Sequence, residues 1–242
     1  MQHHNMSDAE LIQEVISRVS AFDIRSSRGS YPEPNVQIKI KRAAILLPVT
    51  VKDGEVLILL TKRSKHLRSH PSTVSFPGGM RDETDSSDID AALREAEEEI
   101  GLPPSAVKVL GILTLGVTLP ANIVYPVVGI IPNDFVPKCN PSEVEYAFYM
   151  PLKTFVEEGK VIRKPGIFRG KKVHYSELHY THDKQTDRIF GFTCNYCIFL
   201  AAIIFGSLVA QYEGETFISA NEIAGRLKQY FQFITSPVGA KL

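Results

Sequence analysis

The chain has 242 residues, a formal net charge of zero and a hydrophobic content of 44%. This length can bury a hydrophobic core without disulfides or a structural metal, and the composition is typical of a soluble globular protein. The balance of 27 basic and 27 acidic residues argues against a broad basic surface for nucleic acid or an anionic membrane. We therefore expect no nucleic-acid partner and no membrane attachment.

Residues 1–35 are predicted to form an N-terminal helix followed by a linker arm. Ser7 and Glu10 have the spacing of a capping box, which starts a helix. Apolar residues then recur at helical spacing, whereas residues 22–35 contain serine, glycine and two prolines, which is typical of a linker. The N-terminus lacks the apolar region of a secretory signal peptide.

Residues 36–236 are predicted to form the main domain, which begins with a β-hairpin. Asp53-Gly54 separates two apolar runs, and this dipeptide is a strong hairpin signal. A long polar loop over 62–85 leads to a helix over 86–100, and Gly101 is a favourable residue to end that helix. Strands are predicted over 43–51, 56–61, 107–116, 123–132 and 143–150.

The last third of the chain is predicted to be a polar, loop-rich segment over 157–188, followed by helices over 193–211 and 219–233. The most apolar stretch, 196–210, is shorter than the ~20 residues of a membrane span, so we interpret it as a core helix. A membrane-attached protein that uses this stretch is the alternative. Mixed strands with one central helix and a C-terminal helix indicate an α/β or α+β sandwich.

The chain contains three cysteines, Cys139, Cys194 and Cys197. A small, odd number argues against a disulfide framework and favours a reducing compartment. Cys194 and Cys197 lie within the apolar helical run, so we interpret them as buried thiols rather than as a redox or metal site.

The helix over 86–100 carries the pattern that indicates chemistry. At about 100° per residue, Glu99 lies about 40° from Glu95 and Glu98 about 60° to the other side, so three carboxylates share one face. Like charges at this spacing repel each other, but Mg²⁺ takes oxygen ligands from a few carboxylates and from substrate phosphates. The alternative is an acidic solvent-exposed face. The Gly-Gly turn before the helix and the Arg94 next to Glu95 argue against it.

This segment resembles the Nudix box, G-x5-E-x7-R-E-U-x-E-E-x-G-U, in which U is an apolar residue. Gly79 matches the first glycine. The second half matches in order at Arg94, Glu95, Ala96, Glu98, Glu99, Gly101 and Leu102. The chain departs from the box twice, because the spacing from Gly79 to Arg94 is one residue longer and Asp85 stands in place of the first glutamate.

The residues before the box, 59–79, are similar to a further signature of coenzyme A diphosphatases, L-L-T-x-R-S-x3-R-x3-G-x3-F-P-G-G. Ser72 stands where that signature has its first glycine, and the rest fits. This subfamily also tends to carry the one-residue expansion of the box. The resemblance covers mainly residues 43–102, and a weaker similarity is found at residues 189–193.

The resemblance implies a Nudix α/β/α sandwich with a mixed sheet, to which this chain adds N- and C-terminal helices. It implies metal-dependent hydrolysis of the diphosphate bond of coenzyme A, or of an acyl ester, to 3′,5′-ADP and 4′-phosphopantetheine. The metal would be Mg²⁺ or Mn²⁺, held by Glu95, Glu98 and Glu99. Arg94 would orient these carboxylates, and Glu98 is a candidate general base. Glu143 and Glu145 are other sources of a base.

Coenzyme A carries a 3′-phosphate beside its diphosphate, so it needs cationic partners besides the metal. The guanidinium fork suits phosphate oxygens, so Arg63 and Arg68 are the preferred contacts, with Lys62 and Lys65 as weaker candidates. His66 and His70 are interpreted as loop residues. The expected substrate-binding residues are Arg63, Arg68, Ser64, Gly78 and Gly79.

Two alternatives stay open at this point. One is a Nudix diphosphatase that acts on ADP-ribose, NADH or another nucleoside diphosphate derivative. The other is a non-catalytic Nudix fold used for binding, which would not need an intact set of Glu95, Glu98 and Glu99.

Residues 237–242 are predicted to be a C-terminal tail. Ala240, Lys241 and Leu242 are a variant of the peroxisomal signal S-K-L, which an import receptor recognises. Coenzyme A and its esters are abundant where fatty acids are oxidised. The tripeptide therefore predicts a peroxisomal protein, and otherwise the cytosol is expected.

Overall fold

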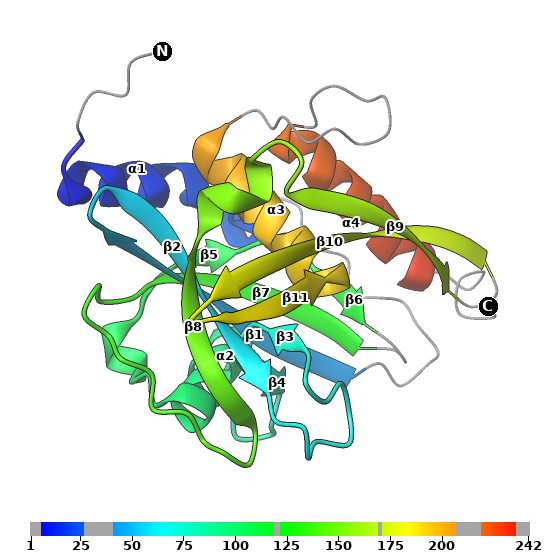
Figure 1. Cartoon of the computed structure of the whole chain (residues 1–242), viewed down its shortest axis with the longest axis horizontal. Helices are drawn as coiled ribbons and strands as arrows, with labels where there is room; N and C mark the ends of the chain where they lie inside the picture. Colours follow the sequence, from blue (N-terminus) through cyan, green and yellow to red (C-terminus); the bar gives the residue numbers. More distant parts are fainter. Residues whose placement is uncertain (1–5, 27–40, 119–121, 169–170, 207–218, 236–242) are drawn as a thin grey trace.

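The computed structural model describes residues 6–26, 41–118, 122–168, 171–206 and 219–235 (Figure 1). The described strands of the main sheet are β1 (Lys41–Lys52), β2 (Glu55–Arg63), β3 (Val74–Ser75), β4 (Gly78–Met80), β5 (Lys108–Ile112), β6 (Gly116–Thr118), β7 (Asn122–Ile130) and β8 (Val144–Pro151). Their order is β3-β2-β1-β7-β5, while β4 pairs with β1, β6 with β7 and β8 with β2. The sheet is mixed, because β1 and β7 are parallel and the other pairs are antiparallel.

Helices cover both faces of this sheet (Figure 1). They are α1 (Asp8–Ser20), α2 (Asp88–Ile100), α3 (Gly191–Phe205) and α4 (Ala220–Thr235). Successive residues of a strand point to opposite faces, so Leu46 of β1 packs in the core beside α2, and Leu47 packs in the core with α1 and α3. The predicted α/β class, with a mixed sheet and added terminal helices, is confirmed.

Local sequence signals explain the ends of several elements. Ser7 and Glu10 form the predicted capping box of α1, with hydrogen bonds in both directions. Ser219 and Glu222 make the same pair of bonds at the start of α4. Gly101 follows α2 in the left-handed conformation (φ 67°), where glycine is favoured.

The predicted loop over 62–85 is wrong in part, because it contains strand residues. Lys62 and Arg63 extend β2, and the backbone N–H of Arg63 donates to the carbonyl of Thr73 at 2.9 Å, which closes the loop between β2 and β3. The predicted strand over 107–116 is also interrupted. β5 ends at Ile112, and the carbonyl of Thr114 instead accepts a hydrogen bond from the hydroxyl of Tyr196 at 2.8 Å.

The predicted loop-rich segment over 157–188 is wrong, because most of it forms a second antiparallel sheet. Its strands are β9 (Val161–Phe168), β10 (Lys171–His182) and β11 (Gln185–Phe190), in the order β11-β10-β9. Leu178 and Ile189 are opposite each other and fully buried, which anchors the sheet in the core. The turn is Asp183-Lys184, which lacks the glycine that marks a hairpin in sequence.

The apolar run of α3 is buried in the core as predicted, and Cys194 and Cys197 are fully buried thiols. No helix among the described residues is long and apolar enough to cross a membrane. The domain boundaries at residues 35 and 236 stay predictions. Most of the predicted linker and the whole predicted tail lie outside the described residues, although Ile24–Ser26 form a short 3₁₀ turn.

The turn between β10 and β11 can be tested by comparison with the turn between β1 and β2. Both Asp53-Gly54 (φ 53° and 77°) and Asp183-Lys184 (φ 45° and 66°) are left-handed at both positions. Because a non-glycine residue is strained there, Lys184→Gly is expected to stabilise the chain by about 0.5–1 kcal/mol and Gly54→Lys to destabilise it by a similar amount. Thermal unfolding should show opposite shifts of about 1–4 °C. An unchanged Tm for Lys184→Gly would contradict the β10–β11 turn.

Candidate functional site

Three carboxylates from two parts of the chain form the centre of the site. Glu95 and Glu99 lie one turn apart on α2, and Glu143 comes from the segment that precedes β8. One oxygen from each lies within 4.8 Å of the others. The side chain of Glu99 is only 3% exposed, and Glu95 is also mostly buried. The structure therefore brings together two of the three predicted metal ligands and adds Glu143, which the sequence indicated only as a source of a base.

Glu98, the third predicted ligand, lies apart from these carboxylates. Its side chain is 52% exposed and accepts a hydrogen bond from Arg94 Nη1 at 3.1 Å. The reason is its position on the helix, since it points about 100° away from Glu99, towards solvent rather than towards the sheet.

Burial disfavours the ionised form of the central carboxylates. Burial raises the pKa of Glu99 to about 8, although Arg63, whose Nη1 lies 3.9 Å away, and the N–H of Gly78, at 3.3 Å, both favour the ionised form. Burial also raises the pKa of Glu95, against the effect of Arg94. A hard divalent cation such as Mg²⁺ or Mn²⁺ would offset this repulsion, because such ions prefer carboxylate oxygens. The donor set thus fits the predicted metal.

Arg94 orients the acidic residues around it. Its Nε and Nη2 bind both oxygens of Asp85, at 2.9 and 3.0 Å, and Nη2 also donates to the carbonyl of Met80 at 3.1 Å. Its Nη1 donates to Glu95 and Glu98, each at 3.1 Å. Arg94 therefore has the orienting geometry expected of it, and it leaves no donor directed at a substrate.

Asp85, which stands in place of the first glutamate of the Nudix box, is paired with Arg94. Its side chain is 4% exposed, and the hydrogen bonds from Arg94 hold the pKa of this carboxyl below its usual range. Asp85 and Glu95 thus both form ion pairs with the Arg94 guanidinium.

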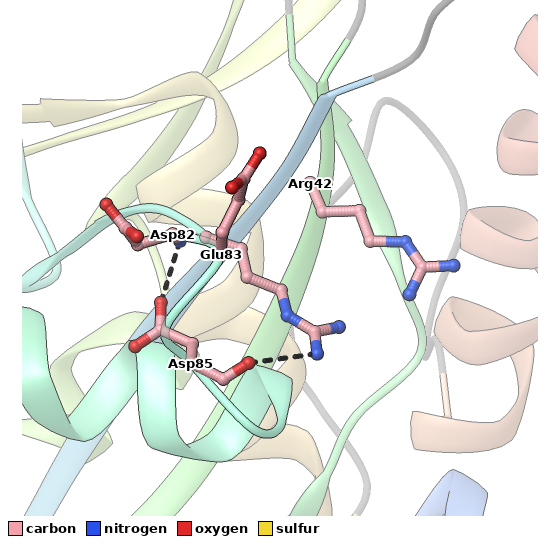
Figure 2. Close-up of a pocket in the computed structure, with 5 residues that line it drawn as sticks. Arg42, Asp82, Glu83 and Asp85 are labelled. Atoms are coloured by element: carbon pink, nitrogen blue, oxygen red, sulfur yellow. Dashed lines mark hydrogen bonds between the residues drawn. The ribbon is translucent and has the colours of Figure 1, made fainter.

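Residues of the loop before α2 form hydrogen bonds with one another (Figure 2). Asp82 donates its backbone N–H to Asp85 Oδ2 at 2.8 Å, and Arg81 donates to the carbonyl of Asp85 at 3.2 Å. With Arg42 and Glu83, these residues line an open pocket of about 410 Å³. Carboxylates outnumber guanidinium groups in its lining, so this pocket is not favourable for a phosphate.

The two glycines before the box allow close packing. An added Cβ on Gly79 would collide with the carboxylate of Glu95, and one on Gly78 (φ 150°) would collide with the backbone of Ala44 and Ile45. Both were predicted to approach substrate phosphate. The structure instead shows β4 in close contact with β1 and α2 at these positions, and the N–H of Gly78 directed at Glu99.

The predicted substrate residues before the box differ in their surroundings. Arg63 faces Glu99, and its Nε is buried without a hydrogen-bond partner among the described residues. Ser64 is buried and donates its backbone N–H to the carbonyl of Glu143 at 2.8 Å, which joins this loop to the acidic residues. Arg68 is exposed on the loop. Lys62 points elsewhere, and its Nζ lies 2.7 Å from Asp187.

Comparison with known proteins identifies the family. Residues 39–169, which are more than half of the chain, match the model of the NUDIX domain. The chain is 48% identical over 120 residues to a protein of Escherichia coli K12 described as the uncharacterized Nudix hydrolase NudL, and equally to NudL of Shigella boydii. These alignments cover 50% of this chain and 62% of each relative, so the match spans less than two thirds of the relatives' length.

Solved structures show weaker likenesses. The Ap4A hydrolase of C. elegans in a binary complex matches with a TM-score of 0.41 and 18% identity, over 47% of this chain and 82% of that chain. The Nudix hydrolase RenU of M. smegmatis matches with a TM-score of 0.41 and 21% identity, over 47% and 72%.

The acidic residues give a direct test of metal binding. Binding of Mg²⁺ to the folded chain at about 100 times its Kd should contribute about 2.7 kcal/mol, which raises Tm by about 5–10 °C for a chain of this size. Glu99→Gln is expected to abolish this shift in thermal unfolding. Glu97→Gln, at an exposed position of the same helix, is the matched control and should keep it. A full shift in Glu99→Gln would contradict the metal site.

The raised pKa of Glu99 predicts a pH dependence in the metal-free chain. With a folded-state pKa of about 8 and an ordinary value of 4.5 for a glutamate, the folded state binds the additional proton between these values. The stability that this proton contributes is therefore present below pH 4.5 and is lost as pH rises through about 8. The difference in free energy of unfolding between Glu99→Gln and the unaltered chain should grow in favour of the variant over this range. A difference that stays constant with pH would contradict the assignment.

Proposed function

Because the chain belongs to the NUDIX domain family, we propose that it is a hydrolase that cuts the diphosphate bond of coenzyme A or of its acyl esters. The products are 3′,5′-ADP and 4′-phosphopantetheine, or its acyl form. One observation carries the proposal: Arg63 of the coenzyme A signature lies 3.9 Å from Glu99 of the acidic site. A diphosphate bound at the acidic residues through a metal would therefore meet the cation of the signature.

The acidic residues take distinct parts in the proposed mechanism. Glu95, Glu99 and Glu143 would hold Mg²⁺ or Mn²⁺, and the bound ion would neutralise charge on the phosphoryl oxygens and lower the pKa of water. Glu98 is the proposed base. Its carboxylate is half exposed and lies outside the three central carboxylates, so it is accessible to accept a proton from water. Arg94 holds Glu98 and Glu95 in place by hydrogen bonds.

The cations near the site support the proposed substrate class. Coenzyme A presents a 3′-phosphate in addition to its diphosphate, and a guanidinium can bind two phosphate oxygens at once. Arg63 is adjacent to Glu99 and has a buried Nε donor without a partner among the described residues, which a phosphate oxygen or bound water would satisfy. Arg68, exposed on the same loop, is proposed to bind the second phosphate. Ser64 places the loop against Glu143.

We propose the peroxisome as the location, with recognition by the import receptor through Ala240, Lys241 and Leu242. This proposal rests on the tripeptide and on the substrate class. The three residues lie outside the described part of the chain.

Product analysis by chromatography tests the proposed function. The purified chain is incubated with Mg²⁺ and coenzyme A, with ADP-ribose and NADH in parallel. We expect 3′,5′-ADP to appear fastest from coenzyme A, and Glu99→Gln to reduce turnover by about 10²-fold or more, since it removes a ligand of the metal. Faster cleavage of ADP-ribose or NADH would reject coenzyme A as the substrate. No cleavage by folded chain would favour a binding module.

A further inference from the structure

The end of β2 presents two neighbouring cations to opposite faces of the sheet. Lys62 Nζ lies 2.7 Å from Asp187 of β11, and Arg63 Nη1 lies 3.9 Å from Glu99 of α2. Both acidic partners are buried, with side chains 2% and 3% exposed. The pairing of β2 with β8 shifts its register between Lys62 and Arg63. Irregularities of this kind change the direction of a side chain and are frequent next to active sites.

Asp187 holds the residues on one side of this register shift. Besides Lys62, it accepts hydrogen bonds from the hydroxyl of Tyr146 at 2.8 Å and from Nε2 of His182 at 2.9 Å. Tyr146 lies directly opposite Lys62 in the pairing of β2 with β8. The carboxylate of Asp187 therefore contacts both β2, through Lys62, and β8, through Tyr146, at the last regular pair before Arg63.

The charge of Asp187 is well supported. Burial raises the pKa of this carboxyl, but hydrogen bonds from Lys62, His182 and Tyr146 lower it further than burial raises it. His182 also stacks on Phe148 of β8, with ring centroids 4.1 Å apart. Removing one partner of a buried ion pair leaves the other charge uncompensated, so the arrangement depends on the carboxylate.

A second contact holds the other end of the same loop. The hydroxyl of Thr193, in the first turn of α3, donates to the carbonyl of Val74 in β3 at 3.2 Å. The hydroxyl of Thr61 in β2 donates to the carbonyl of Ser75 at 3.1 Å. Figure 1 shows β11 beside β3 at this point. The loop over 64–73, which carries Arg68, is thus held at its base by residues that follow the second sheet and by the sheet itself.

We infer that Asp187 is a positioning residue: by holding Lys62 and Tyr146 it fixes the register shift that directs Arg63 at Glu99. It thereby sets the affinity of the site for a phosphate-bearing substrate. The substrate part of this inference rests on the proposed function. Asp187 lies outside residues 39–169, so substrate affinity depends on a part of the chain that the family match does not cover.

The position of Arg63 can be measured without any turnover. Its buried Nε–H gives a side-chain signal in a ¹H–¹⁵N NMR spectrum, which is assigned by its absence in Arg63→Lys. We expect Asp187→Asn to move this signal. Asp183→Asn makes the same chemical change at an exposed position of the same hairpin and should leave the signal in place.

The kinetic measurement uses coenzyme A and coenzyme A without its 3′-phosphate. Asp187→Asn is expected to raise KM for coenzyme A by about tenfold with kcat changed less than about threefold, as for loss of uniform binding. The double variant with Arg63→Ala should be no worse than Arg63→Ala alone, because both changes remove the same interaction. Tyr146→Phe removes only one hydrogen bond to Asp187 and should shift the signal and KM in the same direction by less.

The outcomes separate the inference from the proposed function. An unmoved Arg63 signal in both Asp187→Asn and Tyr146→Phe overturns the inference. A lower Tm with unchanged KM shows a purely structural role and also overturns it. A moved signal in a chain that does not cut coenzyme A rejects the proposed function and leaves the positioning of Arg63 supported. A moved signal with raised KM and no additivity supports both.

Discussion

The site depends on one constraint, which is that two carboxylates of α2 lie buried between this helix and the sheet. Glu95 and Glu99 can only be there because the surrounding residues are small or cationic. Ala91, Ala92 and Ala96 are fully buried and let the helix approach the sheet, and Gly79 leaves room for the carboxylate of Glu95. Arg94 and Arg63 supply the compensating charge from opposite sides. Each of these features costs stability or restricts the sequence, and together they give the oxygen-rich donor set that a divalent cation prefers.

The C-terminal third of the chain supports the loop that lies beside the acidic residues of the Nudix segment. The main sheet and α2 supply the acidic residues, whereas β11 and the start of α3 hold the loop between β2 and β3. In the proposed enzyme, the reaction centre and the substrate loop are thus supported by different parts of the fold. The buried pair of Lys62 and Asp187 stabilises the structure weakly at best after desolvation, and its effect is better understood as specifying one register.

Local signals made much of the fold predictable from sequence. The capping box at Ser7, the Asp53-Gly54 turn and Gly101 at the end of α2 each act within a few residues, and each was predicted. The second sheet was not predicted because its turn has Lys184, rather than glycine, in the left-handed conformation, so the usual hairpin signal is absent from the sequence. Several buried positions of the sheet are polar, namely Ser176, Glu177 and Asp187, and Ile162 and Ile167 are exposed, so the apolar alternation of a strand was obscured.

For the site, the position of Glu95 and Glu99 on one face of α2 was predictable from the sequence, because it depends only on the helical pitch. The contribution of Glu143 was not, since it depends on how the segment before β8 returns to the end of the helix. The backbone N–H of Asn140 donates to the carbonyl of Glu99 at 2.9 Å and fixes that return. The pairing of Lys62 with Asp187 has no sequence signal either, because the partners are far apart along the chain.

The burial of the thiols has a consequence for redox chemistry. Burial raises the pKa of Cys194 to about 12, and it raises the pKa of Cys197 and Cys139 as well. Because the thiolate is the form that reacts with peroxide, burial and the raised pKa both disfavour oxidation of Cys194 and Cys197 in the folded chain. The Cys-x-x-Cys spacing on α3 therefore places two unreactive thiols in the core rather than a redox pair at the surface.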